Sequence, residues 1–285
     1  MDKQNPKIED VKTFWEENPL WTGESELLPG SREFFEEHDF IVIDECQGGH
    51  FDDRFIPSEK NRRRVLDLGC GIGFWTVQLA TRGCRNIVAA DLTEKAIALA
   101  KMRCDIFGVE AEFSIENAEN MSFPDQAFTH VNCQGVIHHT PDTEACVAEI
   151  ARVLADGGTA SISVYYKNIL LRLWPAIGFT GRILSKLGFK LKGRGRENIY
   201  MESDVNEIVR LYDGKDNPIG KAYSRKEFVN MLASHFEVDE TFLHFFPARS
   251  LPFKLPAPVR LFLDRHLGFL IYASLTKKQS SCPEN

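Results

Sequence analysis

One short segment constrains the fold of this chain more than any other. It is VLDLGCGIGFWT (Val65–Thr76), an apolar strand that leads through Gly69, Gly71 and Gly73 into a helical pattern. Glycine has no Cβ, so a backbone of this kind can turn sharply and approach a ligand closely. A strand, a glycine loop and a helix in this order are typical of an open α/β sheet that binds a nucleotide-like ligand.

The residues around this segment alternate between strand and helix patterns. Parallel strands joined by helices that cover both faces of a sheet produce this alternation. A turn is expected at Asp156-Gly157-Gly158, before the fifth strand. The strands expected after the first are Arg85–Asp91, Ala111–Ile115, Phe128–Gln134, Thr159–Val164, Phe236–His244 and Gly268–Leu275.

The chain divides into four parts by pattern: an N-terminal cap segment (1–60), an α/β core (61–166), an insert (167–222) and a C-terminal part that completes the sheet (223–285). The cap segment holds two short helical patterns, with Trp15 and Trp21 between or within them. These tryptophans either cover a pocket or anchor the segment to the core.

Charge and cysteine content exclude several classes of protein. The chain carries a formal charge of -7, but Tyr165–Arg196 contains eight bases and no acid. An acidic body argues against a general nucleic-acid binder. The N-terminus has no apolar leader and the seven cysteines form no CxxC pair, which predicts a cytoplasmic protein with reduced thiols and no bound metal.

The glycine loop does not fit the dinucleotide fingerprint, because Phe74 or Thr76 stands where its last glycine would be. The block Arg62–Tyr166 instead resembles the class I S-adenosylmethionine (SAM)-dependent methyltransferases, and the resemblance extends more loosely to the last two strands. It implies a Rossmann-like seven-stranded sheet with a reversed last strand, SAM as the cofactor and methyl transfer as the activity.

The resemblance also implies which residues bind SAM. The glycine loop would wrap the methionine part, with Asp67 near its amino group, and Asp91 would accept both ribose hydroxyl protons. Asn117 would meet the adenine edge, although Asp is common at that position. The full expected set is Asp67, Gly69, Cys70, Gly71, Gly73, Asp91, Leu92, Asn117, Ala118, Glu119, Gln134, Gly135 and Trp21.

Four residues are candidates for the acceptor side of the reaction. His138 follows the turn expected to contact SAM and could act as a base or orient the acceptor, while His139 would hold the loop. Tyr165 ends the fifth strand, and His50 could enter with the N-terminal segment. Structural roles remain open for all four.

The insert and the acceptor allow several interpretations. The apolar, basic segment 165–196 could be a lid over an apolar acceptor, a peripheral contact with anionic membrane, or a helix pair with a solvated basic face. We expect a small, apolar or aromatic acceptor, methylated on oxygen before nitrogen or sulfur. The alternatives are a macromolecular or lipid acceptor at a membrane surface, and a non-catalytic SAM-binding protein.

Overall fold

One mixed sheet organises the chain. The structure is a computed structural model that describes residues 6–186, 199–251 and 253–279. The strand order is β3-β2-β1-β4-β5-β8-β7, and β6 pairs with β5 beside this path. The strands are β1 (Val65–Leu68), β2 (Ile87–Asp91), β3 (Glu112–Ile115), β4 (Phe128–Gln134), β5 (Leu154–Tyr166), β6 (Ala222–Tyr223), β7 (Phe236–His244) and β8 (Leu270–Lys277).

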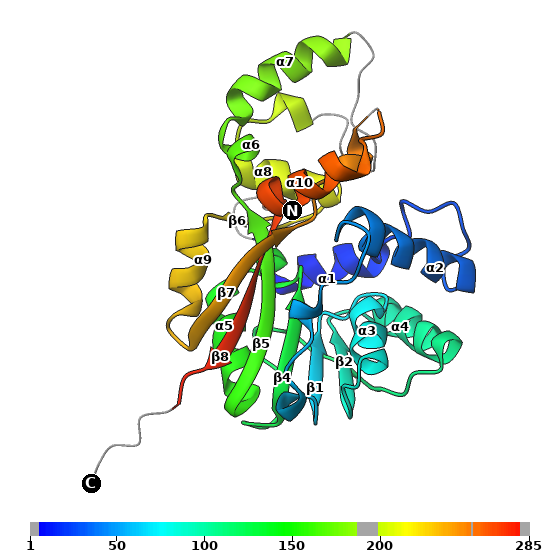
Figure 1. The fold of residues 1–285 in the computed structure, drawn as a ribbon, viewed down its shortest axis with the longest axis vertical. Helices are drawn as coiled ribbons and strands as arrows, with labels where there is room; N and C mark the ends of the chain where they lie inside the picture. The colour runs from blue at the N-terminus through cyan, green and yellow to red at the C-terminus, as the bar shows by residue number, and fades with distance from the viewer. Residues whose placement is uncertain (1–5, 187–198, 252, 280–285) are drawn as a thin grey trace.

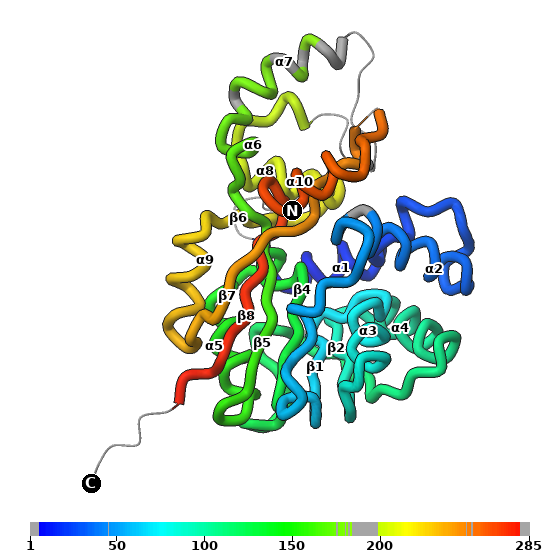
Figure 2. Tube along the Cα trace, in the orientation of Figure 1, coloured from blue at the N-terminus to red at the C-terminus, as the bar shows by residue number. Residues whose placement is uncertain are grey.

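The last strand, β8, runs against its neighbours. It pairs antiparallel with both β5 and β7, whereas the pairs from β3 through β5 are parallel. Figure 2 shows this red strand between green β5 and orange β7. The Rossmann-like sheet with a reversed last strand is therefore confirmed, and the two-residue β6 is an addition to it.

Helices cover the sheet and extend beyond the carboxyl ends of its strands. Helices α3 and α4 lie beside the β1–β2–β3 half, and α5 and α9 lie beside the β5–β8–β7 half (Figure 1). Helices α1, α2, α6, α7, α8 and α10 lie beyond the strand ends, where open sheets bind ligands. Their bounds are α1 (Ile8–Glu17), α2 (Arg32–Phe40), α3 (Phe74–Thr81), α4 (Glu94–Phe107), α5 (Thr143–Val153), α6 (Ile169–Arg172), α7 (Trp174–Lys186), α8 (Val205–Asp213), α9 (Arg225–Leu232) and α10 (Ala257–Leu267).

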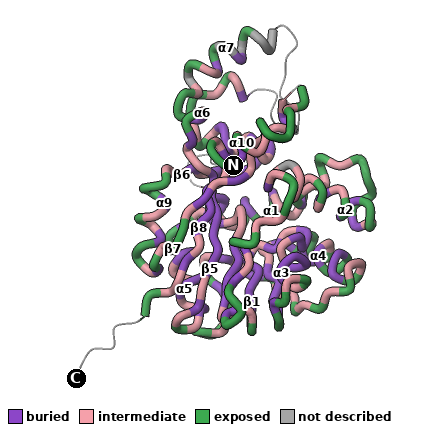
Figure 3. The backbone as a smooth tube through the Cα atoms, viewed as in Figure 1, coloured by how far each residue is buried: buried purple, intermediate pink, exposed green. Residues whose placement is uncertain are grey.

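The core lies in the middle of the sheet, where the strands are buried along most of their length (Figure 3). Leu66, Val131, Ile162 and Ala273 are each at most 2% exposed, and they come from four adjacent strands. Strands of a sheet covered on both faces need apolar side chains on both sides, which explains their nearly continuous apolar sequences.

Local sequence signals fix several helix ends. Ser224 accepts a hydrogen bond from the backbone N–H of Glu227, whose carboxylate accepts one from the N–H of Ser224, so α9 starts with a capping box. Asp142 caps α5 through the N–H of Ala145. Such caps satisfy backbone donors that a helix end leaves unpaired.

One expected turn is wrong. Residues 156–158 belong to β5, which already begins at Leu154 opposite Phe128. The ladder shifts register between Phe128 and His130, and Gly157 has a φ of +70°, so the two glycines form an irregularity within the strand.

In the described part of the chain, no helix combines the length and apolar character needed to cross a membrane.

Candidate functional site

A first cavity, of about 150 Å³, opens at the carboxyl ends of β1, β2 and β4. The connections after these strands supply its polar walls, and residues of the N-terminal cap cover it. Sequence-distant residues that were expected to bind one ligand therefore share one cavity. They are Gly69, Gly71, Asp91, Leu92, Asn117, Ala118, Gln134 and Gly135.

The glycine loop is shaped by contacts that a side chain would prevent. Gly69 has a φ of +70°, and a Cβ on it would lie 2.2 Å from Cγ2 of Val136. Gly71 has a φ of +51° and donates its N–H to Oδ2 of Asp91 at 3.0 Å. The loop after β1 is thus held against both neighbouring strands.

Asp91 connects the glycine loop to the start of α4. Its Oδ2 accepts the bond from Gly71, and its Oδ1 accepts bonds from the backbone N–H and the hydroxyl of Thr93 at 3.0 and 2.9 Å. Burial raises the pKa of this carboxyl, while these bonds oppose the rise. The hydroxyl of Thr93 therefore binds the carboxylate rather than capping the helix.

Asp67 lies beneath the glycine loop, and it lines neither this cavity nor the next. Its carboxylate accepts hydrogen bonds from the hydroxyl of Thr76 at 2.6 Å and from Nδ2 of Asn132 at 2.8 Å. Burial raises its pKa to about 6. Asp67 therefore ties α3 to β4 from below the loop, and its expected contact with the amino group of SAM stays a prediction.

Three more expected residues also support the cavity from behind. Gly73 starts α3 close to the backbone of Ala100, and Cys70 is buried with its N–H bonded to the carbonyl of Ala90. The carboxylate of Glu119 accepts the N–H of Asp142 at 2.6 Å. None of the three appears in the lining of the first cavity.

A second cavity, of about 230 Å³, adjoins the first. Five residues line both cavities: Trp15, Leu20, Gln134, Gly135 and His139. His138 and Tyr165, two of the residues expected on the acceptor side, also line the second cavity. Trp21 belongs here too and not to the first cavity; its indole N–H donates to Glu37 at 2.9 Å.

His50 lies apart from this group. It is exposed on the loop before Phe51 and lines neither cavity, whereas Cys46 and Gln47 of the same segment line the second. A role for His50 in the site thus stays a prediction.

His138 is a buried imidazole with an available nitrogen. Its ring centroid lies 4.2 Å from that of His139 and 4.3 Å from that of Tyr165, and its exposed fraction is 1%. Within the part of the chain that the structure describes, its Nδ1 has no hydrogen-bond partner. Burial, with help from His139 and Lys221, lowers the pKa of His138 well below 6.5, so the ring is neutral at pH 7.

Asp213 is a site residue that sequence reasoning missed. It ends α8, and its carboxylate accepts the hydroxyl of Tyr165 at 2.7 and 2.8 Å. Nε2 of His139 lies 3.3 Å from the same carboxylate, and Nδ1 of His139 lies 2.7 Å from the carbonyl oxygen of Ile219. In a sequence, an Asp-Gly pair such as Asp213-Gly214 indicates only a turn.

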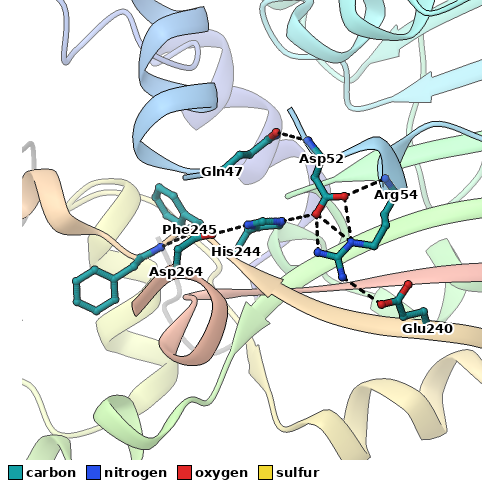
Figure 4. A network of polar contacts seen from close by, with 8 residues as sticks. Gln47, Asp52, Arg54, Glu240, His244, Phe245 and Asp264 are labelled. Carbon is teal, nitrogen blue, oxygen red and sulfur yellow. Dashed lines mark hydrogen bonds and ion pairs between the residues drawn. The ribbon is translucent and has the colours of Figure 1, made fainter. Parts of the chain in front are cut away.

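A partly buried ion network holds the N-terminal segment against the C-terminal part of the chain (Figure 4). Nε2 of His244, on β7, lies 2.8 Å from Asp52, and its Nδ1 lies 2.5 Å from Asp264 on α10. Asp52 also pairs with Arg54 and accepts its backbone N–H. Oε1 of Gln47 accepts the N–H of Asp52, so the network reaches a wall of the second cavity.

The network needs a charged imidazole. Both ring nitrogens of His244 face carboxylates, and only the imidazolium can donate from both. Burial would lower the pKa of His244, but the bonds to Asp264 and Asp52 outweigh it and raise the pKa. Burial would likewise raise the pKa of Asp52, but His244 and Arg54 hold it well below its ordinary value.

Comparisons with known proteins show which proteins this chain is similar to. Residues 65–158 match a family model described as a methyltransferase domain. Over 184 residues the chain is 29% identical to a ubiquinone biosynthesis O-methyltransferase of Azoarcus sp. (strain BH72). The alignment covers 60% of this chain and 76% of that protein.

Two further similarities extend this result. A protein of the same name from Aromatoleum aromaticum is 29% identical over 117 residues, and the alignment spans 41% of this chain but only 50% of that relative. A solved SAM-dependent methyltransferase from Methanosarcina mazei, 22% identical, superposes with a TM-score of 0.52 over 75% of this chain and 91% of that one. The latter shows the same fold.

Replacing Asp91 tests the first cavity. We expect Asp91→Ala to weaken SAM binding at least about 100-fold in calorimetry, because two charge-assisted hydrogen bonds to a ribose would be lost. Asp91→Asn keeps one acceptor oxygen for the Gly71 N–H and should lose less. Asp105→Ala, at an exposed position on α4, is the control. Unchanged affinity in Asp91→Ala would remove this residue from the cofactor site.

Replacing His244 tests the ion network. We expect His244→Ala to lower the free energy of unfolding by about 3–5 kcal/mol, since Asp264, which is 0% exposed, loses its cation. Exposed His266→Ala is the control. The contribution of a raised pKa is complete below the unfolded value of about 6.5 and disappears as the pH rises through the folded pKa. Chemical denaturation should therefore show a smaller difference at pH 9 than at pH 6; an equal difference contradicts the charged imidazole.

Proposed function

Because this chain belongs to the class I SAM-dependent methyltransferase family and takes SAM as its cofactor, we propose that it methylates a small acceptor held in the second cavity, on oxygen first. One observation carries this proposal: the cavity lined by the expected SAM residues and the cavity lined by His138 and Tyr165 adjoin, and share Gln134, Gly135 and His139. A donor and an acceptor can then meet at that boundary.

The residues of the first cavity fit the cofactor. SAM, when bound, supplies a methyl group on a positively charged sulfur. The acceptor takes the methyl group by displacing this sulfur in line. Gly69 and Gly71 line the first cavity without side chains, and Asp91 offers a carboxylate to a diol. The side-chain Oε1 of Gln134 is buried and unpaired within the described residues, so a donor group on a ligand would satisfy it.

His138 is the residue that we propose for proton handling. An alcohol or phenol loses its proton on methylation, and a neutral imidazole with an unpartnered Nδ1 can accept it. The lowered pKa keeps the ring neutral and ready as an acceptor at pH 7, although it also makes the ring a weaker base. A phenol is easier to deprotonate than an aliphatic alcohol, so a phenolic acceptor matches this base best.

Asp213 would position the neighbours of His138 rather than contact the proton in transit. Its carboxylate fixes the hydroxyl of Tyr165 and faces Nε2 of His139. Both rings pack on His138, so their orientation fixes the imidazole plane. The cap residues Trp15 and Leu20 close the boundary between the cavities, which would exclude water from the transfer.

Acceptor size and the relatives' names support a small oxygen acceptor. A cavity of about 230 Å³ suits one or two rings rather than a macromolecule. The matched Azoarcus and Aromatoleum proteins are named as O-methyltransferases of ubiquinone biosynthesis.

The experiment that tests the proposal is the release of S-adenosylhomocysteine from SAM with a panel of phenols, catechols, amines and thiols. We expect turnover with at least one oxygen acceptor. A protein that binds SAM but releases no S-adenosylhomocysteine with any acceptor would instead be a non-catalytic SAM-binding protein, and turnover with amines alone would contradict the choice of oxygen.

Replacing His138 tests the proton acceptor. We expect His138→Ala to reduce kcat about 100-fold or more while SAM affinity changes less than about twofold. In the unaltered protein the acid limb of the kcat profile should lie below pH 6.5, because the neutral form is active and burial lowers the pKa. His235→Ala is a histidine control outside both cavities. Full activity in His138→Ala would contradict the proposed role of His138 as the proton acceptor.

A further inference from the structure

A third cavity, of about 220 Å³, lies within the segment that follows β5. Helices α6, α7 and α8 surround it together with residues near Ile199 and Pro247. These helices lie beyond the carboxyl end of β5 in Figure 1. The residues that line the cavity are Asn168, Leu170, Leu171, Trp174, Ile177, Ile199, Tyr200, Ile208, Tyr212, Phe246, Pro247, Ser250, Leu251 and Phe269.

The chemistry of this lining selects an uncharged, apolar ligand. Most of these side chains are aliphatic or aromatic, and no Asp, Glu, Lys, Arg or His stands among the described residues that line the cavity. A charged ligand group would lose its hydration there without a partner, which is costly. An alkyl chain or an apolar ring gains about 0.8 kcal/mol per buried methylene, which is about fourfold in affinity.

The third cavity adjoins the second cavity at Tyr212, and most of the residues around that point are aromatic. Tyr212 lines both cavities. Phe245 and Leu270 line the second cavity, and their chain neighbours Phe246 and Phe269 line the third. The ring of Tyr212 lies 5.1 Å from that of Phe269 and 6.0 Å from that of Phe245. A change of rotamer at these rings would join the two cavities without any movement of the backbone.

In the part of the chain that the structure describes, helices α6 and α7 line the third cavity and not the second, so they do not form a simple lid over the second cavity. Among the described residues of the insert, Tyr212 and Asp213 line the acceptor cavity, whereas α6 and α7 line the third cavity. The segment 187–198, which carries four of the eight bases, lies outside the described residues. The helices therefore face a neighbouring apolar space rather than the rings of His138 and Tyr165.

We propose that the third cavity is a subsite for the apolar part of the acceptor, which would pass Tyr212 and place an alkyl chain or apolar ring among α6, α7 and α8. The inference rests on the proposed function for the meaning of the second cavity. It adds the substrate class: an acceptor with a polar, methylatable head and an uncharged apolar tail of several carbons.

The test uses catechol and 4-alkylcatechols with methyl, butyl and hexyl chains as probes. Calorimetry measures their binding to the full chain saturated with S-adenosylhomocysteine. We expect affinity to rise about fourfold per methylene until the third cavity is filled. Equal affinity across the series, or no binding of the hexyl compound, overturns the proposal.

Substitutions locate the tail. Ile177→Trp and Leu251→Trp should fill the third cavity and remove the dependence on chain length, while catechol affinity stays within twofold. Leu173→Trp is the matched control, because Leu173 lies between α6 and α7 but is 52% exposed and outside the cavity. A thermal unfolding midpoint within a few degrees of the parent shows that each variant is folded, and using two filling variants protects the test against one that is not.

The outcomes separate this inference from the proposed function. If chain length matters but neither filling variant removes its effect, the tail binds elsewhere and the subsite is wrong, while methyl transfer stands. If S-adenosylhomocysteine is never released although the alkylcatechols bind in the third cavity, the proposed activity fails and the subsite stands.

Discussion

The bond between the backbone N–H of Gly71 and the carboxylate of Asp91 is the constraint on which the rest of this site depends. It joins the loop after β1 to the end of β2, and the same carboxylate fixes Thr93 at the start of α4. With that loop fixed, the missing Cβ of Gly69 lets Val136 approach from the turn after β4. Three strand ends thereby form one cavity.

The sheet, and the gathering of eight expected residues in the first cavity, could be predicted from the sequence because they depend on local patterns. Strand β4 was predicted to the residue, and the glycine loop and Asp91 stand at fixed points of the alternating strand and helix pattern. The acceptor side depends on residues brought together from distant segments: Asp213 at the end of α8 meets Tyr165 on β5. A turn signal at Asp213-Gly214 carries no information about that meeting.

Residues with a family role and residues with a local structural role also look alike in a sequence. Asp67 fits a cofactor motif, yet its carboxylate binds Thr76 and Asn132 below the loop. Trp21 was expected at the cofactor but lines the second cavity. The His244 network joins Asp52 to Asp264 across most of the chain, and no spacing rule could have predicted it.

We propose that the methyl group is transferred beside His138, where the first and second cavities meet at Gln134 and Gly135. A crystal structure of the chain with S-adenosylhomocysteine tests it most directly. We expect the ribose at Asp91 and the sulfur at the boundary, facing the cavity that contains His138 and Tyr165. A sulfur that points away from that cavity, or a ligand that leaves Asp91 and the glycine loop untouched, would contradict this proposal.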